Sequence, residues 1–239
     1  MLHQDISYVI SSGNLLIDRK YNKIEGTIYK AIDNRCDMAH IWIDNLSIEY
    51  IEEISINDKF VITTTINGSD YDIFTGHIYQ VQKICEDKLE IRARSMINFL
   101  EFENIAIKSS NTASILNSIK QLKPIVINIQ NSKNYPVFND LDNPYRIVEK
   151  LARNNSCEWY FRNELYEVFN TGGRTNVFID DAKIIHKKND KECKILLNYL
   201  LHEIEAFDNV VVNKQSIRVT RIYHDIKEGS ITTHIEGLL

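Results

Sequence analysis

The stretch that decides the fold is "IRVTRIYHDIKEGSITTHIEG", residues 217–237. It contains two runs in which apolar and polar residues alternate, joined at a Glu-Gly pair. Period-two alternation, β-branched residues and a glycine turn predict a β-hairpin with one covered face. In the first run the alternation places Ile217, Val219 and Arg221 on one face and Ile222 on the other. The stretch holds no nucleophile and no metal-ligand spacing, so we interpret it as architectural.

Length and composition indicate an ordinary globular protein. A chain of 239 residues holds one large domain or two to three small ones. Its apolar fraction of 44% and charged fraction of 26% are typical of that class. The net charge of −5 argues against a nucleic-acid-binding surface, because such surfaces must neutralise phosphates.

The cysteines and the apolar runs bear on the compartment. Cys36, Cys85, Cys157 and Cys193 are far apart and form no Cys-x-x-Cys motif, which favours reduced, mostly buried thiols. The N-terminal residues lack the pattern of a signal peptide, and no stretch reaches the roughly 18 apolar residues of a membrane span. We therefore expect no membrane segment and synthesis in the cytosol.

The first part of the chain, from about residue 6 to 102, has the patterns of short strands. Asn67-Gly68 between two alternating runs is a strong two-residue hairpin signal, and Glu86-Asp87-Lys88 predicts a second turn. Five or six short strands at this spacing predict a small antiparallel barrel or sandwich.

The middle of the chain changes to a helical period. Asn111 or Thr112 caps a predicted helix that continues to Leu122, and Asn143 with Pro144 begins a second one that ends at 154–155. The stretch "CEWYFRNELYEVFN" then predicts a hairpin that turns at 162–163. This part is a small α+β unit, in which a helix is followed by a hairpin.

The segment 192–205 fits two structures. Its apolar residues recur at helical spacing, so the pattern alone favours a helix, whereas the valines that follow at 210–212 favour strands.

Two candidate chemical groups are better explained as structure. Cys157 follows a helix C-terminus, whereas a nucleophilic thiol needs a helix N-terminus or a neighbouring cation. His224 and His234 lie on the ribbon, but a zinc site would need a third ligand that the local sequence lacks.

The remaining candidates also lack a chemical context. The acidic pairs 52–53 and 180–181 are typical of solvated turns, and the glycines at 172–173 open no helix that would bind phosphate. We expect no catalytic residues, no cofactor and no metal.

The order of these parts resembles a known family. The block "IEGTIYKAIDNRCDMAHIWIDN", the hairpin motif "FTGHI" at 74–78 and a strand ending at Arg92–Arg94 come first. They are followed by the helix and hairpin of 143–170 and by a terminal ribbon with His before its turn and Thr after it. This succession resembles the tail baseplate hub proteins of tailed phages and phage-tail-like particles, including contractile injection systems and R-type bacteriocins.

The resemblance implies a mainly β (α+β) fold in which two small antiparallel β-barrel or sandwich domains flank a small helix-plus-hairpin domain. The expected domains are a first barrel at 1–105, a middle domain at 106–190 and the strands of a second barrel at 191–239. The resemblance also implies that 192–212 is mostly strand, in conflict with the helical pattern.

The implied function is structural. In this family three protomers, each with two similar barrels, form a pseudo-sixfold ring that joins the hexameric tail tube to the trimeric spike or tail-tip protein. The ring contacts other baseplate proteins and lines the channel through which DNA passes. The resemblance implies a non-enzymatic protein that is made in the bacterial cytoplasm and incorporated into a virion or tail-like particle, without a cell-wall-degrading domain.

The sequence does not decide whether the particle is a virus or a bacteriocin, or whether its tail contracts. It also does not decide which spike docks or which residues line the channel. Two alternatives remain: a cell-wall carbohydrate-binding module that uses Trp42 and Trp159, and a peptidoglycan hydrolase of the same machinery. For the hub, we expect subunit contacts on strands 58–66, 71–80 and 217–236. The expected contact residues are Asp58, Phe60, Phe74, Thr75, His77, Arg218, Arg221, His224 and His234.

Overall fold

The computed structural model describes residues 7–13, 15–95, 104–122, 125–128, 134–162, 165–170, 176–179, 183–189, 192–227 and 230–239. The chain forms two compact units, a larger one of residues 1–95 with 175–239 and a smaller one of residues 96–174. Both are described separately below. The fold is mainly β and its sheet is largely antiparallel, which confirms the predicted fold class, while the division into domains at 105 and 190 stays a prediction.

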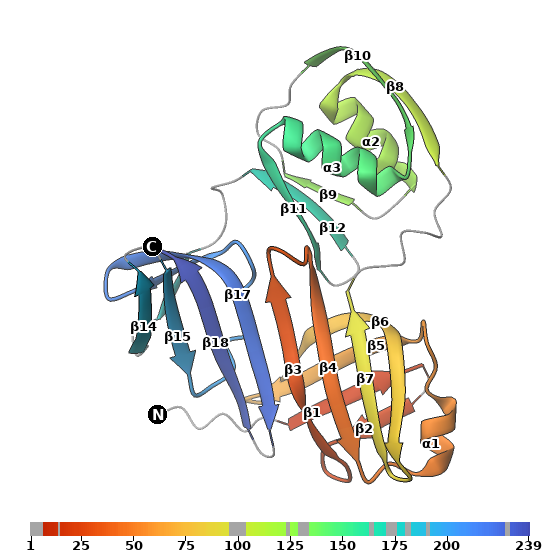
Figure 1. The fold of residues 1–239 in the computed structure, drawn as a ribbon, viewed down its shortest axis with the longest axis vertical. Helices are drawn as coiled ribbons and strands as arrows, with labels where there is room; N and C mark the ends of the chain where they lie inside the picture. Colours follow the sequence, from red (N-terminus) through yellow and green to blue (C-terminus); the bar gives the residue numbers. More distant parts are fainter. Residues whose placement is uncertain are drawn as a thin grey trace. The chain divides into compact units, whose positions relative to one another are not determined.

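The N-terminal half of the larger unit consists of antiparallel strands and one short helix (Figure 1). Along the sheet the strands follow the order β3-β4-β7-β6-β5-β1-β2, and among the described residues β2 does not pair back to β3, so no closed barrel forms. The elements are β1 (Ser7–Ser12), β2 (Leu15–Asp18), β3 (Lys23–Ala31), β4 (Cys36–Asp44), α1 (Ile48–Glu53), β5 (Lys59–Ile66), β6 (Ser69–Cys85) and β7 (Lys88–Arg94).

The predicted turns of this half are confirmed. Asn67 and Gly68 join β5 to β6 with φ values of 52° and 81°, the positive φ pair of a type I′ hairpin turn. Residues 86 and 87 separate β6 from β7, whose ends pair at Cys85 and Lys88.

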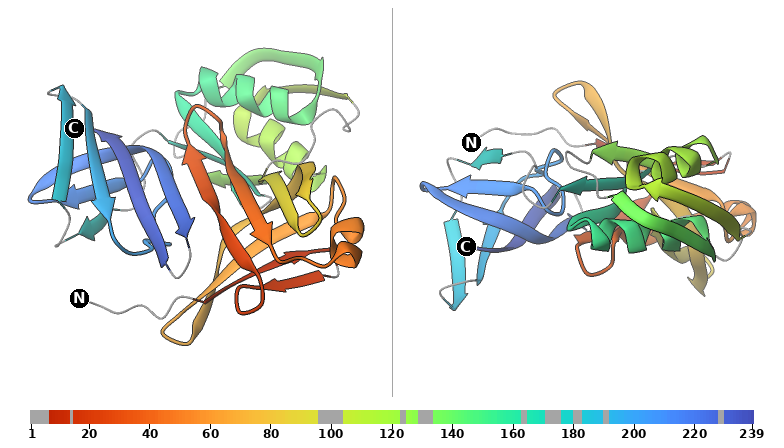
Figure 2. Two further views of the ribbon diagram at one scale, coloured as in Figure 1. Left: turned by 60° about the horizontal axis from the view of Figure 1, so that its bottom comes forward. Right: turned by 90° about the horizontal axis from the view of Figure 1, so that it is seen from above.

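The C-terminal half contributes a second set of strands. β17 pairs with β3, so the path β14-β15-β18-β17 continues directly into the first half. Figure 2 shows the two groups side by side, in blue and in red to yellow. The elements are β13 (Asn176–Ile179), β14 (Lys183–Asn189), β15 (Glu192–Leu197), β16 (Asn209–Val212), β17 (Gln215–Lys227) and β18 (Ser230–Leu238).

The prediction of a helix at 192–205 is wrong. Residues 192–197 form β15, and 198–208 have no regular helix or strand. Cys193, Ile195 and Leu197 are buried in alternation while β15 pairs along its whole length with β18, so strand pairing overrides the helical spacing. The strands expected from the resemblance are present as β15 and β16, separated by this irregular segment.

The predicted terminal hairpin is confirmed, but its strict alternation is wrong. A β-bulge between Val219 and Arg221 shifts the phase of β17, so Ile217, Val219 and Ile222 are all buried. Arg221 is exposed on the other face. The Glu-Gly turn itself lies outside the described residues.

Each half has its own hydrophobic core. The N-terminal core draws on β1 to β7 and α1, with Phe60 and Phe74 in edge-to-face contact at 6.2 Å between ring centroids. The C-terminal core gathers the alternating residues of β15 to β18. Ile226 and Ile231 of the ribbon belong to the first core, and Ile222 and Ile235 belong to the second. The ribbon thus contributes to both cores.

The smaller unit is the predicted helix followed by a hairpin. Both caps are confirmed, because Asn111 Oδ1 accepts from Ser114 N at 3.3 Å and Asn143 Oδ1 accepts from Tyr145 N at 3.0 Å. The hairpin turn at 163 lies outside the described residues. The elements are β8 (Ile105–Asn111), α2 (Thr112–Leu122), β9 (Ile125–Asn128), β10 (Asn134–Asp142), α3 (Pro144–Asn154), β11 (Cys157–Arg162) and β12 (Leu165–Asn170).

None of the helices described has both the length and the apolar character needed to cross a membrane.

Candidate assembly surface

The larger unit contains a structural repeat. The chain order β3, β4, β5, β6, β7 in the first half corresponds to β14, β15, β16, β17, β18 in the second. Each half places four of these strands in one antiparallel path, β3-β4-β7-β6 and β14-β15-β18-β17. In each half the remaining strand, β5 or β16, pairs with the first part of the long strand that follows it. The same four pairings therefore occur twice.

The long strands β6 and β17 also share a local irregularity. Each first pairs with the short strand before it and then with the strand after it, and each has a β-bulge against its later partner. The bulges lie between Ile78 and Gln80 in β6 and between Val219 and Arg221 in β17. A bulge bends a strand and increases its twist, which allows one strand to leave one pairing and enter the next.

The two repeats meet head to tail. The last strand of the path β14-β15-β18-β17 pairs with the first strand of β3-β4-β7-β6 over Arg221–Ile226 and Gly26–Ala31. At this junction the rings of Tyr29 and Tyr223 lie 4.8 Å apart, and burial with the neighbouring Tyr223 raises the pKa of Tyr29 to about 12. The eight strands thus form one continuous sheet.

The face of this sheet that points away from the two cores carries rows of ion pairs between neighbouring strands. Arg221 contacts Asp33 at 2.9 Å and Glu236 at 3.4 Å, and Lys194 also contacts Glu236. Hydrogen bonds with Lys194 and Arg221 hold the pKa of Glu236 below its usual range, although burial opposes this. Further pairs between neighbouring strands are Lys88–Asp44 at 2.9 Å and His234–Asp225 at 3.5 Å, and Lys23 pairs with Glu25 within β3 at 3.2 Å.

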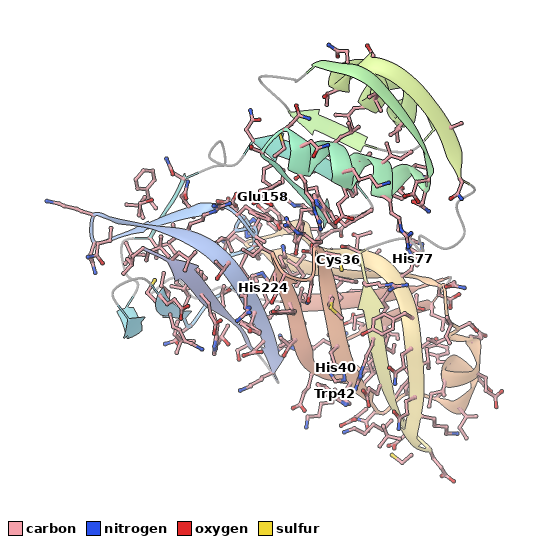
Figure 3. All side chains as sticks on the ribbon, turned by 45° about the horizontal axis from the view of Figure 1, so that its top comes forward. Cys36, His40, Trp42, His77, Glu158 and His224 are labelled. Carbon is pink, nitrogen blue, oxygen red and sulfur yellow. The ribbon has the colours of Figure 1, made fainter. Side chains whose placement is uncertain are left out.

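One cluster on this face combines charge with an aromatic ring. His40 Nε2 lies 2.7 Å and Arg92 Nη2 lies 2.8 Å from the Oε1 atom of Glu90. The His40 ring also lies 3.9 Å from the Trp42 ring, and Figure 3 shows both side chains on β4. The hydrogen bonds from His40 and Arg92 lower the pKa of Glu90, against the opposing effect of burial. The Glu90 carboxylate thus already has two partners within the protein.

A hollow on this face lies beside the bulge of β17. It has a volume of about 450 Å³ and is lined by Asp33, Lys194, Thr220, Arg221 and Glu236 among others. Its charged groups include the network described above, so their charges are compensated within the protein. The hollow therefore offers weak support for a small-molecule site. Among the described residues, no group of three His, Cys, Asp or Glu side chains has the arrangement of a metal site.

The expected contact residues differ in how far they are exposed. Arg221 and His234 are exposed on the ribbon, and Asp58, His77 and Arg218 are half-buried. Thr75 is 9% exposed. Phe60, Phe74 and His224 are 0% exposed within the single chain, so we assign their side chains to its interior.

The resemblance implied two similar halves, but sequence reasoning missed which strands correspond and the partners of Arg221. Asp33 and Glu236 were not singled out, although both carry a charge opposite to a residue that was. Pattern analysis identifies strands but not which strands pair, so the juxtaposition of a turn at Asp33 with the bulge at Arg221 had no local signal.

Comparison with solved structures shows the same fold in phage tail proteins. The chain is similar to the 43 kDa tail protein of prophage MuSo2 from Shewanella oneidensis, with a TM-score of 0.70, 9% identity and 97% coverage of both chains. It is also similar to a tail protein of Neisseria meningitidis MC58, with a TM-score of 0.60, 8% identity and coverage of 98% and 96%.

A third similar structure is the Escherichia coli protein c3393, with a TM-score of 0.58 and 9% identity, covering 99% of this chain and 74% of that one. It is described as a component of the type VI secretion system with structural similarity to the T4 tail proteins gp27 and gp5. No protein-family model and no curated protein matches the sequence. The fold implied by the resemblance is thus confirmed: this chain has the fold of phage tail proteins.

Proposed function

We propose that this protein is the structural hub of a phage tail or phage-tail-like particle. Three copies form a ring with pseudo-sixfold symmetry, which joins the hexameric tail tube to a trimeric spike or tail-tip protein and contacts other baseplate proteins. The sheet face that bears the ion pairs lines the delivery channel. The protein acts through geometry and carries out no reaction.

The observation that carries this proposal is the repeat in the larger unit. Two equivalent four-stranded paths joined head to tail present two similar surfaces in one chain. A head-to-tail contact closes into a ring when its repeated rotation completes a full turn. Three copies with two repeats each supply six similar positions, which match a sixfold partner on one side and a threefold partner on the other.

The charge on the outward face supports its role as a channel wall. In the network near Arg221, the carboxylates of Asp33 and Glu236 pair with the cations of Arg221 and Lys194, so the two signs alternate there. DNA binding depends on unpaired cations that neutralise phosphates. Cations that are already paired, as Arg221 and Lys194 are, favour passage of DNA over its retention.

The first test is the mass of the purified protein in solution, measured by light scattering over a dilution series. The proposal predicts a species of three times 27.9 kDa at high concentration, and co-assembly of that species with a tail tube protein. A strict monomer that also fails to assemble with the tube protein would contradict it. Binding of such a monomer to purified cell wall would favour the carbohydrate-binding alternative.

A further inference from the structure

The internal junction between β17 and β3 indicates how two copies of the chain meet. This inference rests on the proposed ring and specifies the surface that closes it. In the repeat, β17 corresponds to β6 and β3 corresponds to β14. We propose that β6 of one copy pairs antiparallel with β14 of the next copy, as β17 pairs with β3 inside each copy.

Both strands have an edge available for this pairing. β5 pairs with β6 only as far as His77, and from Ile78 to Cys85 the described pairing of β6 is with β7 on one side. β14 is the last strand of the path at the opposite end and pairs with β15. Gln82, Ile84 and Cys85 are exposed, and Ile84 retains 46% of its surface. Exposed strand edges of this kind favour pairing with another chain.

Alignment of the two repeats at their hairpin turns gives a register for the proposed contact. β7 and β18 align through the buried residues that follow their hairpin turns, which makes Arg92 equivalent to His234. Because Gln80 is opposite Arg92 and Tyr223 is opposite His234, Gln80 is equivalent to Tyr223.

The other strand follows by the same reasoning. Tyr29 pairs with Met38, which pairs with Arg94, whereas His186 pairs with Lys194, which pairs with Glu236. The alignment of β7 with β18 makes Arg94 equivalent to Glu236. His186 is therefore equivalent to Tyr29.

Inside the chain, Tyr223 is directly opposite Tyr29. The proposed contact consequently places Gln80 of one copy opposite His186 of the next. One position further along, the same alignment places Val81 opposite Ile184, as His224 is opposite Ile28 within the chain. This alignment places two apolar residues opposite each other. That is expected at a position that faces the core, because the residues of a strand alternate between the two faces of a sheet.

Engineered disulfides test this register. In a Cys85→Ser background, which removes the exposed native thiol, the pair Gln80→Cys with His186→Cys should link neighbouring chains. Directly opposite residues of antiparallel strands have Cα separations of about 4.5–5.5 Å, within the range of disulfides. Mild oxidation should then give linked dimers and trimers on a non-reducing gel, and reductant should return them to single chains.

Two matched variants show whether the linkage reports the register. Tyr29→Cys with Tyr223→Cys occupies the equivalent positions of the internal junction and should link within one chain, without increasing its mass. Gln80→Cys with Lys183→Cys joins the same two strands out of register, and its yield of linked chains should be at least several-fold lower.

The outcomes separate this inference from the proposed function. A trimer in solution whose matched pair links no better than the out-of-register pair would retain the ring and overturn the β6–β14 contact. A strict monomer that also fails to assemble with the tail tube protein would overturn both. Amide hydrogen exchange of the unmodified protein gives a second readout, because protection of 78–85 and 183–189 should rise together as the trimer forms; unchanged protection in the trimer would contradict the contact.

Discussion

The Nδ1 atom of His224 lies 3.1 Å from the Oγ1 atom of Thr233, across the covered face of the terminal ribbon. Both residues are 0% exposed, and the same Thr233 oxygen accepts the Leu201 amide at 3.0 Å. The equivalent positions in the first half hold Val81 and Ile91. A polar pair therefore occupies, in one repeat, the place of an apolar pair in the other, between the two hydrophobic cores.

This burial makes folding sensitive to acid. Desolvation, with smaller effects of Lys30 and His202, holds the pKa of His224 well below the usual value for histidine of about 6.5. Below pH 6.5 the unfolded chain binds a proton at this histidine that the folded chain does not, so stability falls as the pH falls. The loss should approach about 1.4 kcal/mol per pH unit. Urea unfolding at pH 7.5, 6.5 and 5.5 measures it.

Two substitutions test whether His224 is responsible for the acid sensitivity. His224→Gln removes the titration, so its stability should vary less between pH 6.5 and 5.5 than that of the unmodified protein. His234→Gln changes an exposed histidine on the neighbouring strand and should retain the acid sensitivity. Equal pH dependence in His224→Gln and the unmodified protein would show that another group is responsible.

The buried ion pair between Lys30 and Glu205 should contribute strongly to stability. Lys30 Nζ and Glu205 Oε1 are 2.9 Å apart, and the two side chains are only 4% and 14% exposed. Replacement of one partner leaves a buried charge without its counterion, which typically costs about 3–5 kcal/mol. Glu205→Gln should therefore lower the free energy of unfolding by about 3 kcal/mol, measured by urea denaturation at pH 7.5.

A double variant tests whether the stability is lost because one buried charge remains without its counterion. Lys30→Met combined with Glu205→Leu removes both charges and should recover most of the stability lost in Glu205→Gln. Arg221→Gln removes the two ion pairs of an exposed arginine, with Asp33 and Glu236, and should cost about 1 kcal/mol or less. A Glu205→Gln protein as stable as Arg221→Gln would contradict the importance of the buried pair.

Gly76 should not tolerate a side chain. A Cβ atom at this position would lie 2.3 Å from the carbonyl oxygen of Arg94 and 2.9 Å from the Phe74 ring. Overpacking of this kind typically costs about 1–3 kcal/mol, and we expect Gly76→Ala to lie at the upper end because the closest atom is backbone. A thermal melt measures the loss.

The matched control is Ser69→Ala, at the exposed start of the same strand. This substitution should leave the melting temperature nearly unchanged. If Gly76→Ala and Ser69→Ala have the same melting temperature, the close approach of β6 to β7 at Gly76 does not constrain the fold.

The sequence predicted local structure better than it predicted pairing. Asn67-Gly68, the Asn143 cap and the terminal hairpin each depend on neighbouring residues, and the structure confirms all three. The helix predicted at 192–205 failed because its apolar spacing fits both periods, and only pairing with β18 decides between them. The bulge after Val219 likewise depends on the partner strand, and the alternation gave no sign of it.

The assembly surface was still less accessible from the sequence. Arg221 was expected at a contact, but its interaction with Asp33 joins residues 188 positions apart. The equivalence of β6 with β17 depends on the order of strands in space, because period-two alternation is common to all of them. The resemblance to tail hub proteins implied two similar halves, and the pairings show which strands correspond.

Electron microscopy of the purified assembly tests the central claim most directly. The account predicts closed rings with a central opening, threefold symmetry in averaged end-on views, and a strong additional sixfold component from the two repeats of each chain. Rings with another subunit number, or threefold particles without the sixfold component, would contradict the proposal that the two halves occupy similar positions around one channel.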